Sequence, residues 1–182
     1  MQLRKKLKKV AADQGGFTLI ELLVVIGILA ILLAITLIAL NPTQHFQGAR
    51  NAQRSSDVTA ILDGVYEYEA KNTGNLPPSV ASLDTNAHAL SNNTTKYNTS
   101  NSDPNPLRNQ APVNLCSDIV PTYLADLPKD PDTNFSSQTP SSGSACAATT
   151  YDTGYTIAKS VSGRFTISAP GAENGANIAV TR

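Results

Sequence analysis

The sequence predicts an α+β fold in which a long N-terminal helix packs on a small antiparallel β-sheet. Three observations support this prediction: residues 17–40 are almost continuously apolar, residues 49–71 keep apolar side chains at helical spacing, and residues after 152 alternate. A chain of 182 residues is long enough for one globular domain and an anchor. We therefore divide it into a leader (1–16), an apolar helix (17–40), an amphipathic helix (41–71) and a globular head (72–182).

The leader is basic and ends in two glycines. It carries Arg4, Lys5, Lys6, Lys8 and Lys9 against Asp13 alone, so the rest of this neutral chain is net negative. Lys and Arg that flank a first membrane span stay in the cytoplasm. We therefore expect a cytoplasmic N-terminus, with everything after residue 40 outside the membrane. No convincing A-x-A-like site follows the apolar region, so we expect that region to be retained rather than removed as a signal peptide.

The apolar segment 17–40 has the length and composition of a membrane-spanning helix. As a helix it would extend about 36 Å, against a hydrocarbon core of ~30 Å. Four residues interrupt its aliphatic and aromatic composition: Thr18, Glu21, Gly27 and Thr36. A carboxylate inside a membrane helix costs roughly 2.5–3.5 kcal/mol, so Glu21 either reaches the interface from one helix end or has a function.

Glu21 would gain a partner if the chain were cut between Gly16 and Phe17, because a neighbouring copy could then present its new α-amino group. The residues around this bond resemble the processing site and N-terminal helix of type IV pilins and related prepilins, whose pattern is matched by Gly16, Phe17, Thr18, Leu19 and Glu21. The resemblance implies cleavage after Gly16 by a prepilin peptidase and N-methylation of Phe17 by the same enzyme. It also implies a role in assembly for Glu21 and a pilin fold for the chain.

The amphipathic segment 41–71 begins at Asn41 and Pro42, and a proline inside a helix removes a hydrogen bond and clashes with the preceding turn. We predict a helix kink at Pro42 because helical periodicity resumes soon afterwards; a plain end of the membrane segment is the alternative. The apolar stripe of this helix comprises Val58, Ile61, Leu62, Val65 and Tyr68. Gly74, followed by Pro77 and Pro78, is expected to end the helix near residue 71.

Residues 72–115 are rich in Asn, Ser, Thr and Pro and contain few apolar positions. We expect a loop-like surface segment that lies over the sheet, with at most a helical turn or two between Ser79 and Leu90. A second short helical turn is expected between Asp118 and Leu127.

Cys116 and Cys146 are the two cysteines of the chain, and both would lie outside the membrane, where an oxidising compartment favours a disulfide. Closing a loop of this length is worth roughly 3–4 kcal/mol in the chain-entropy model. A zinc site is excluded, because two Cys at this distance with no His nearby do not match a zinc spacing. The pair also resembles the disulfide that often closes a C-terminal loop in pilins.

Residues 127–131, Leu-Pro-Lys-Asp-Pro, are similar to an element of the major pseudopilins of type II secretion that also occurs in pilins. The pseudopilin pattern continues with Trp-Gly, whereas this chain has no Trp and continues with Asp-Thr-Asn. Asp130, Asp132 and Asn134 have the spacing of the first three ligands of a calcium loop, and Asp126 lies nearby. The Gly and the Glu that such a loop requires are Phe135 and Ser141 here, so these four residues are weak calcium candidates and no other metal is expected.

The C-terminal residues alternate in character and predict three antiparallel strands, at about 153–159, 163–169 and 176–181. Ser160 to Gly163 would form a four-residue hairpin turn, and Pro170 to Gly175 a longer connection.

The chemical motifs of the chain do not predict an enzyme. Asp152-Thr153-Gly154 matches an aspartic-protease tripeptide, but that mechanism needs a second copy, and here we expect a turn before a strand. His45 and His88 have no catalytic or ligand partner at a recognisable spacing. We therefore expect no cofactor and no small-molecule substrate, and nucleic-acid binding stays open.

The sequence thus predicts a structural subunit of a type IV pilus-like extracellular filament. The precursor would sit in the cytoplasmic membrane, and its partners would be the prepilin peptidase, the pilus assembly machinery and further copies of itself in a helical polymer. One alternative is a pseudopilin of a type II secretion or DNA-uptake system, which would form a short periplasmic filament. Another is a membrane-anchored binding or hydrolytic domain that never assembles.

Overall fold

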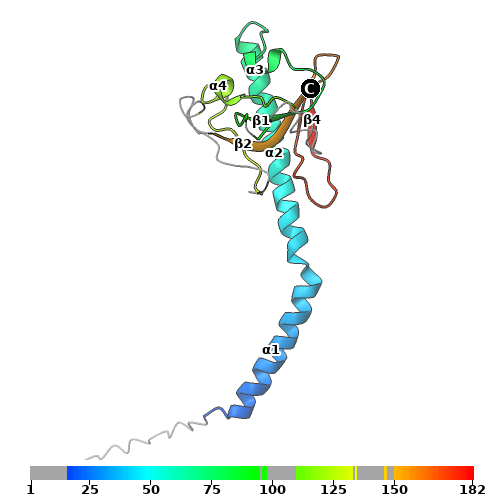
Figure 1. The fold of residues 1–182 in the computed structure, drawn as a ribbon. Coiled ribbons are helices and arrows are strands. Elements are labelled where there is room, and N and C mark those ends of the chain that lie inside the picture. The colour runs from blue at the N-terminus through cyan, green and yellow to red at the C-terminus, as the bar shows by residue number, and fades with distance from the viewer. Residues whose placement is uncertain (1–15, 95, 98–109, 133, 135–145, 147–149) are drawn as a thin grey trace, which may run out of the picture. The chain divides into compact units, whose positions relative to one another are not determined.

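A computed structural model describes residues 16–94, 96–97, 110–132, 134, 146 and 150–182 of the chain. The chain divides into two compact units, Met1–Pro42 and Thr43–Arg182. Its elements follow in the order α1 (Leu19–Leu40), α2 (Pro42–Lys71), α3 (Pro78–Ala81), β1 (His88–Ser91), α4 (Cys116–Ile119), β2 (Asp152–Lys159), β3 (Phe165–Ser168) and β4 (Ala179–Thr181) (Figure 1).

Helix α1 lies in the first unit, and every one of its 22 residues is exposed. It is long enough and apolar enough to cross a membrane. Signal sequences near an N-terminus meet the same criteria of length and composition. A helix suits such surroundings because it satisfies its backbone hydrogen bonds internally.

The helical backbone is interrupted at Asn41, which adopts a left-handed conformation with φ 38° and ψ 67°. Asn tolerates this conformation better than most residues because its short polar side chain can bond locally. Pro42 then takes the first position of α2. A backbone N–H at this position would have no acceptor within the helix, so proline loses no helical hydrogen bond there. The predicted kink residue therefore lies next to the interruption rather than inside a helix.

Helix α2 provides the central element of the second unit. Its buried residues are Arg54, Val58, Ile61, Leu62, Gly64 and Val65, which repeat at helical spacing on one face. The apolar members pack in one core with Tyr155 and Ile157 of β2 and with Phe165 and Ile167 of β3. Burial of a Val, Leu, Ile or Phe side chain contributes roughly 1.5–3 kcal/mol to the stability of the fold, so this stripe holds the helix against the sheet.

The sheet has the order β1-β2-β3-β4 with antiparallel pairing between all neighbours, and β2 crosses α2 in Figure 1. Ile157 pairs with Ile167, which pairs with Val180. The α+β prediction is confirmed, and the arrangement is consistent with a pilin fold. The three C-terminal strands lie close to their predicted positions, although β3 and β4 are shorter.

Strand β1 was not expected, because residues 72–115 were predicted to be loop-like. The one-turn helix α3 does lie in the predicted region, but His88–Ser91 form an edge strand that pairs with β2. The register shifts between Ala89 and Ser91, and Leu90 bridges Val113 in parallel. Four residues without alternation give no local signal for a strand, because their partners lie far along the chain.

Helix α2 ends where the sequence predicts, whereas α4 starts earlier than expected. Helix α2 ends at Lys71, where Thr73 and Gly74 both adopt positive φ and the N–H of Gly74 donates to the carbonyl of Glu69 at 2.9 Å. Helix α4 starts at Cys116 and covers one turn, two residues before the predicted start of that turn.

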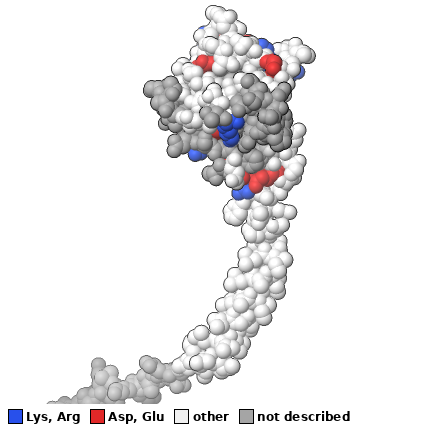
Figure 2. Space-filling model, in the orientation of Figure 1, with Lys and Arg blue, Asp and Glu red and all other residues white. Residues whose placement is uncertain are grey.

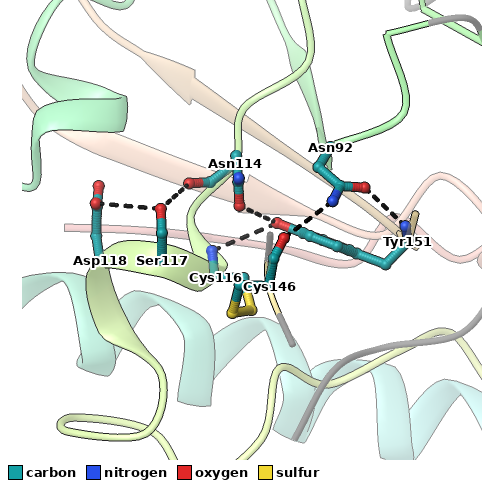
Figure 3. The surroundings of a disulfide bond; sticks show 7 residues. All are labelled: Asn92, Asn114, Cys116, Ser117, Asp118, Cys146 and Tyr151. Carbon is teal, nitrogen blue, oxygen red and sulfur yellow. Dashed lines mark hydrogen bonds between the residues drawn. A yellow bond between two sulfur atoms is a disulfide. The ribbon is translucent and has the colours of Figure 1, made fainter. Parts of the chain in front are cut away.

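The predicted disulfide between Cys116 and Cys146 is confirmed, with 5.6 Å between the Cα atoms. Figure 3 shows Tyr151 beside this bond, where its hydroxyl donates to Asn114 Oδ1 at 2.9 Å and accepts from the N–H of Cys116 at 3.4 Å. Asn92 connects Cys146, the other half of the disulfide, with the backbone of Tyr151. Its side-chain amide donates to the carbonyl of Cys146 at 3.1 Å and accepts from the N–H of Tyr151 at 2.7 Å. The buried disulfide is therefore surrounded by a partly buried set of hydrogen bonds.

Candidate functional site

The candidate site is the segment from Gly16 to Glu21, where the chain enters α1. Gly16, Phe17 and Thr18 precede the helix, and Thr18 is its N-cap in an extended conformation with φ −80° and ψ 152°. The side chain of Phe17 is 89% exposed, and a Cβ placed on Gly16 would meet no atom within 4 Å. The peptide bond between Gly16 and Phe17 thus lies outside the helix, between two exposed residues.

Thr18 and Glu21 form a reciprocal capping box. Glu21 Oε2 accepts from the N–H of Thr18 at 2.8 Å and from its hydroxyl at 2.7 Å, while Thr18 Oγ1 accepts from the N–H of Glu21 at 3.3 Å. These bonds satisfy donors that a helix start leaves without partners. The negative charge also lies at the positive end of the helix dipole, which favours it.

The capping box leaves part of the carboxylate available. Both bonds from Thr18 use Oε2, and among the described residues no hydrogen bond to Oε1 is observed. The side chain lies on an exposed helix turn. A cation brought to this turn by another molecule could therefore bind Oε1 while Oε2 continues to cap the helix.

The apolar side chains of α1 form a continuous exposed surface. Those with large side chains are between 49% and 83% exposed. On the side in view, Figure 2 shows α1 without charged side chains, whereas Lys, Arg, Asp and Glu appear on the second unit. Soluble proteins rarely expose a continuous apolar surface of this extent, so α1 is suited to lipid or to other apolar helices.

A second group of interest is the Arg54 cluster, which we define as Arg50, Asn51, Arg54, Asp130 and Glu173. Arg54 is fully buried, and its Nε and Nη2 donate to the two oxygens of buried Asp130, each at 2.8 Å. Its Nη1 donates to Glu173 Oε2 and to Asn51 Oδ1, both at 2.9 Å. Arg50 also pairs with Glu173. The cluster joins α2 to the loop before β2 and to the connection between β3 and β4.

The electrostatics of this cluster follow from its hydrogen bonds. Bonds from Arg50 and then Arg54 lower the pKa of Glu173 to about 2. The bond to Asp130 raises the pKa of Arg54, which stays charged although it is buried. Nearby, Asp57 accepts from the Tyr155 hydroxyl at 2.7 Å, and burial raises the pKa of Asp57.

Sequence reasoning missed the Arg54 cluster. One local signal was present, because Arg54 precedes Val58 by four residues and therefore falls on the apolar stripe of α2. A long charged side chain at such a position needs a buried partner of opposite charge. The identity of that partner could not be predicted from spacing, since Asp130 lies 76 positions away.

The weak calcium candidates lie in different surroundings. Both oxygens of Asp130 bind Arg54, while Asp132 accepts from the N–H and the side-chain amide of Asn134, each at 2.9 Å. Asp126 is exposed. In the described part of the chain, no three His, Cys, Asp or Glu side chains are grouped so that they could hold a metal ion.

Two further sequence interpretations need correction. Asp152 does not belong to a turn: it is the buried first residue of β2, pairs with Lys96, and accepts from the Tyr97 hydroxyl at 2.9 Å. His88 is not isolated, because Asp84 and the carbonyl of Ala111 lie within hydrogen-bond distance of its ring. His45 lies exposed on α2.

Comparison with known proteins adds evidence for the first site. No curated protein and no solved structure matches the chain. Residues 12–37 match a family model described as the prokaryotic N-terminal methylation motif. This segment includes the exposed Gly16–Phe17 bond, the capping box and most of α1, and with the apolar helix it fits a membrane-anchored precursor. The chain therefore carries, at the start of its exposed apolar helix, the N-terminal methylation signal of type IV prepilin-like proteins.

Proposed function

We propose that the chain is a structural subunit of a type IV pilus-like extracellular filament. The observation that carries this proposal is the fully exposed apolar helix α1, which begins at a cleavage and methylation signal and holds one carboxylate in its first turn. A prepilin-type motif implies processing by a prepilin peptidase and handling by the pilus assembly machinery. The role is structural, and no catalytic step is assigned to the chain.

The assembly mechanism follows from the surfaces of α1. In the membrane, lipid covers the apolar side chains; in the filament, the same side chains would pack against α1 of other copies. Lipid and neighbouring helices are similarly apolar, so tight packing and polar contacts have to decide association. A head-to-tail contact of this kind does not close on itself, and it therefore produces a filament.

Glu21 supplies the polar contact in this mechanism. Removal of residues 1–16 makes Phe17 the first residue, and its α-amine, with or without a methyl group, is a cation. The amine of one copy would bind the open Oε1 of Glu21 in the next. Because desolvation offsets much of the attraction between buried charges, the contact contributes more to register than to net stability.

Mass spectrometry of protein from purified filaments tests the processing step. The expected N-terminal peptide begins at Phe17 and carries one methyl group on its amine. Filaments built from chains that retain residues 1–16 would overturn the proposal. An intact leader on a protein that works without assembling would instead favour a membrane-anchored binding domain.

Substitution of Glu21 tests the assembly step. Glu21→Ala is expected to insert into the membrane normally but to yield few or no filaments by electron microscopy. Thr36→Ala is a matched control, because Thr36 is the other polar side chain of α1 and its hydroxyl donates to the carbonyl of Leu33 within its own helix. Normal filaments from Glu21→Ala would contradict the mechanism.

A pseudopilin is the second candidate function. It is favoured by the Leu-Pro-Lys-Asp-Pro element at residues 127–131, whose aspartate is buried against Arg54. Processing and membrane topology would be the same in both cases. Immunogold labelling of intact cells separates them: a pilus subunit is expected in fibres that extend beyond the cell surface, and a pseudopilin only in the periplasm.

A further inference from the structure

His88, the first residue of edge strand β1, makes contacts on both sides of its ring. Nδ1 lies 2.9 Å from the carbonyl oxygen of Ala111, and Nε2 lies 2.8 Å from Asp84 Oδ1. Ala111 leads into the stretch that pairs with β1, where the N–H of Val113 donates to the carbonyl of Ala89 at 2.8 Å. The buried ring therefore connects the turn before β1 with the segment that lies beside it.

The two contacts make different demands on the ring. A backbone carbonyl and a carboxylate both accept hydrogen bonds, so each needs an N–H from the imidazole. Only the protonated ring has two N–H groups. A neutral ring keeps one contact and turns a lone pair towards the other acceptor.

Charge decides which contact a neutral ring keeps. A hydrogen bond to an ionised acceptor is stronger than one to a neutral carbonyl, so the remaining proton stays between Nε2 and Asp84. Asp84 is also fixed independently, because it accepts from the N–H of Asn86 at 2.8 Å and from its side-chain amide at 2.7 Å. The contact to Ala111 is then the one that is lost.

We propose that His88 is an acid-dependent clamp, which holds the segment Ala111–Val113 against β1 when its ring is protonated and releases that segment when the ring is neutral. Histidine changes charge within the range of about pH 5–8, so the clamp responds to ordinary changes in the surroundings. It adds a conformational device to the second unit and does not depend on filament assembly.

The surroundings of the ring are consistent with this behaviour. A cavity of about 300 Å³ borders His88, Asp84, Ala111 and the two serines of α3 and its C-cap, so the segment has room to move. Among the described charged groups, Asp84 contacts the ring itself. Two others bind the backbone of α3: Asp118 of α4 accepts from the N–H of Ser79 at 3.0 Å, and Lys159 of β2 donates to the carbonyl of Ala81 at 3.0 Å.

Asp84 limits the clamp at low pH. The hydrogen bond from His88 is the main cause of the lowered pKa of Asp84, and bonds from Asn86 act in the same direction. Because the pKa of Asp84 is lowered, the stability that its ionised form contributes is complete at pH values above the ordinary carboxyl pKa. That stability is lost as the pH falls through the lowered pKa. Protonation of Asp84 in strong acid would therefore remove the ionised partner of the ring and weaken the clamp.

Amide hydrogen exchange on the full-length protein in detergent tests the clamp. The protection factor of the Val113 amide, corrected for intrinsic exchange, is compared at pH 5.5 and pH 8, with the Ala169 amide as a reference. Ala169 donates to the carbonyl of Ile178 near the opposite edge of the sheet. We expect a roughly two- to fivefold loss of protection for Val113 at pH 8 and no change for Ala169.

Three variants make the test specific. In Asp84→Asn, Nε2 of a neutral ring can accept from the new side-chain amide, and Nδ1 can then keep its hydrogen bond to the carbonyl of Ala111. Protection of the Val113 amide should therefore stay high at both pH values. His88→Gln should abolish the pH dependence, whereas His45→Gln should retain it. An unchanged Val113 amide in the wild type, or a pH-dependent loss that persists in Asp84→Asn, would overturn the proposal.

Discussion

At the scale of single residues, Arg54 shows how a buried charge is kept in this small core. Each of its three nitrogens donates to Asp130, Glu173 or Asn51, and two of these partners are carboxylates that compensate the desolvated charge. Such a pair adds little net stability over an apolar pair of the same size, but removal of one partner leaves an uncompensated charge. The cluster therefore fixes which loops lie against α2.

Substitution of Arg54 should be strongly destabilising for this reason. Arg54→Ala is expected to lower the free energy of unfolding by about 3–5 kcal/mol, measured by urea titration in detergent. All six tyrosines lie in the second unit, so the tyrosine band in near-ultraviolet circular dichroism reports on that unit alone. Arg50→Ala is the matched control, because Arg50 binds the same glutamate from a partly exposed position and its loss should destabilise the protein much less.

Glu173 predicts how the same cluster responds to acid. Its pKa is lowered to about 2 from an ordinary 4.5, so its contribution is complete above pH 4.5 and is lost as the pH falls towards 2. We expect Glu173→Gln to melt below the wild type at pH 6 and to converge with it near pH 2. Glu67→Gln, which removes a charge from the exposed face of α2, should not show this convergence.

At the scale of elements, the long helices could be predicted and β1 could not. The signals for α1 and α2 are local: continuous apolar composition in one case and helical spacing with a glycine stop in the other. Strand β1 exists because Ala89 and Leu90 find Thr156 and Val113, and such distant pairings leave no trace in a four-residue segment. The Arg54 cluster escaped prediction for the same reason, since its members come from three separate segments.

The start of α1 shows what sequence could predict about the candidate site. The positions of Gly16, Phe17 and Glu21 follow from a short motif, but the capping box required the structure. The motif alone gives Thr18 no role of its own. In the structure, its backbone N–H and its hydroxyl both donate to Glu21 and hold that side chain in place. Thr18 is therefore a positioning residue for the carboxylate.

Two substitutions at Thr18 test this role. Thr18→Val keeps the shape of the side chain but removes the hydroxyl, which should cost the helix start about 1 kcal/mol and reduce filament yield. Thr18→Ser keeps the hydroxyl and should restore yield towards the wild type. Filament mass per unit of membrane-inserted protein, measured after shearing, is the readout, and equal yields from the two variants would refute a positioning role.

At the scale of the whole chain, two units with different solvent requirements are joined near Pro42. The second unit has its own core, a sheet with four paired strands and a disulfide, and the buried residues of that core all lie after residue 50. The first unit contributes a helix whose every residue is exposed. This division fits the proposed role, in which a membrane-anchored precursor carries a separately folded globular head.

Truncation before Thr43 tests this division directly. Because no buried residue of the described core comes from 16–42, a chain that starts at Thr43 should be soluble without detergent and should keep the tyrosine near-ultraviolet spectrum of the full-length protein. Its melting temperature should lie within a few degrees of the full-length value, since the lost segment removes no core contact. The truncated chain should nevertheless fail to enter filaments when it is mixed with processed full-length subunits. Incorporation of the truncated chain would show that the heads alone polymerise, and loss of its tyrosine spectrum would show that the head depends on α1.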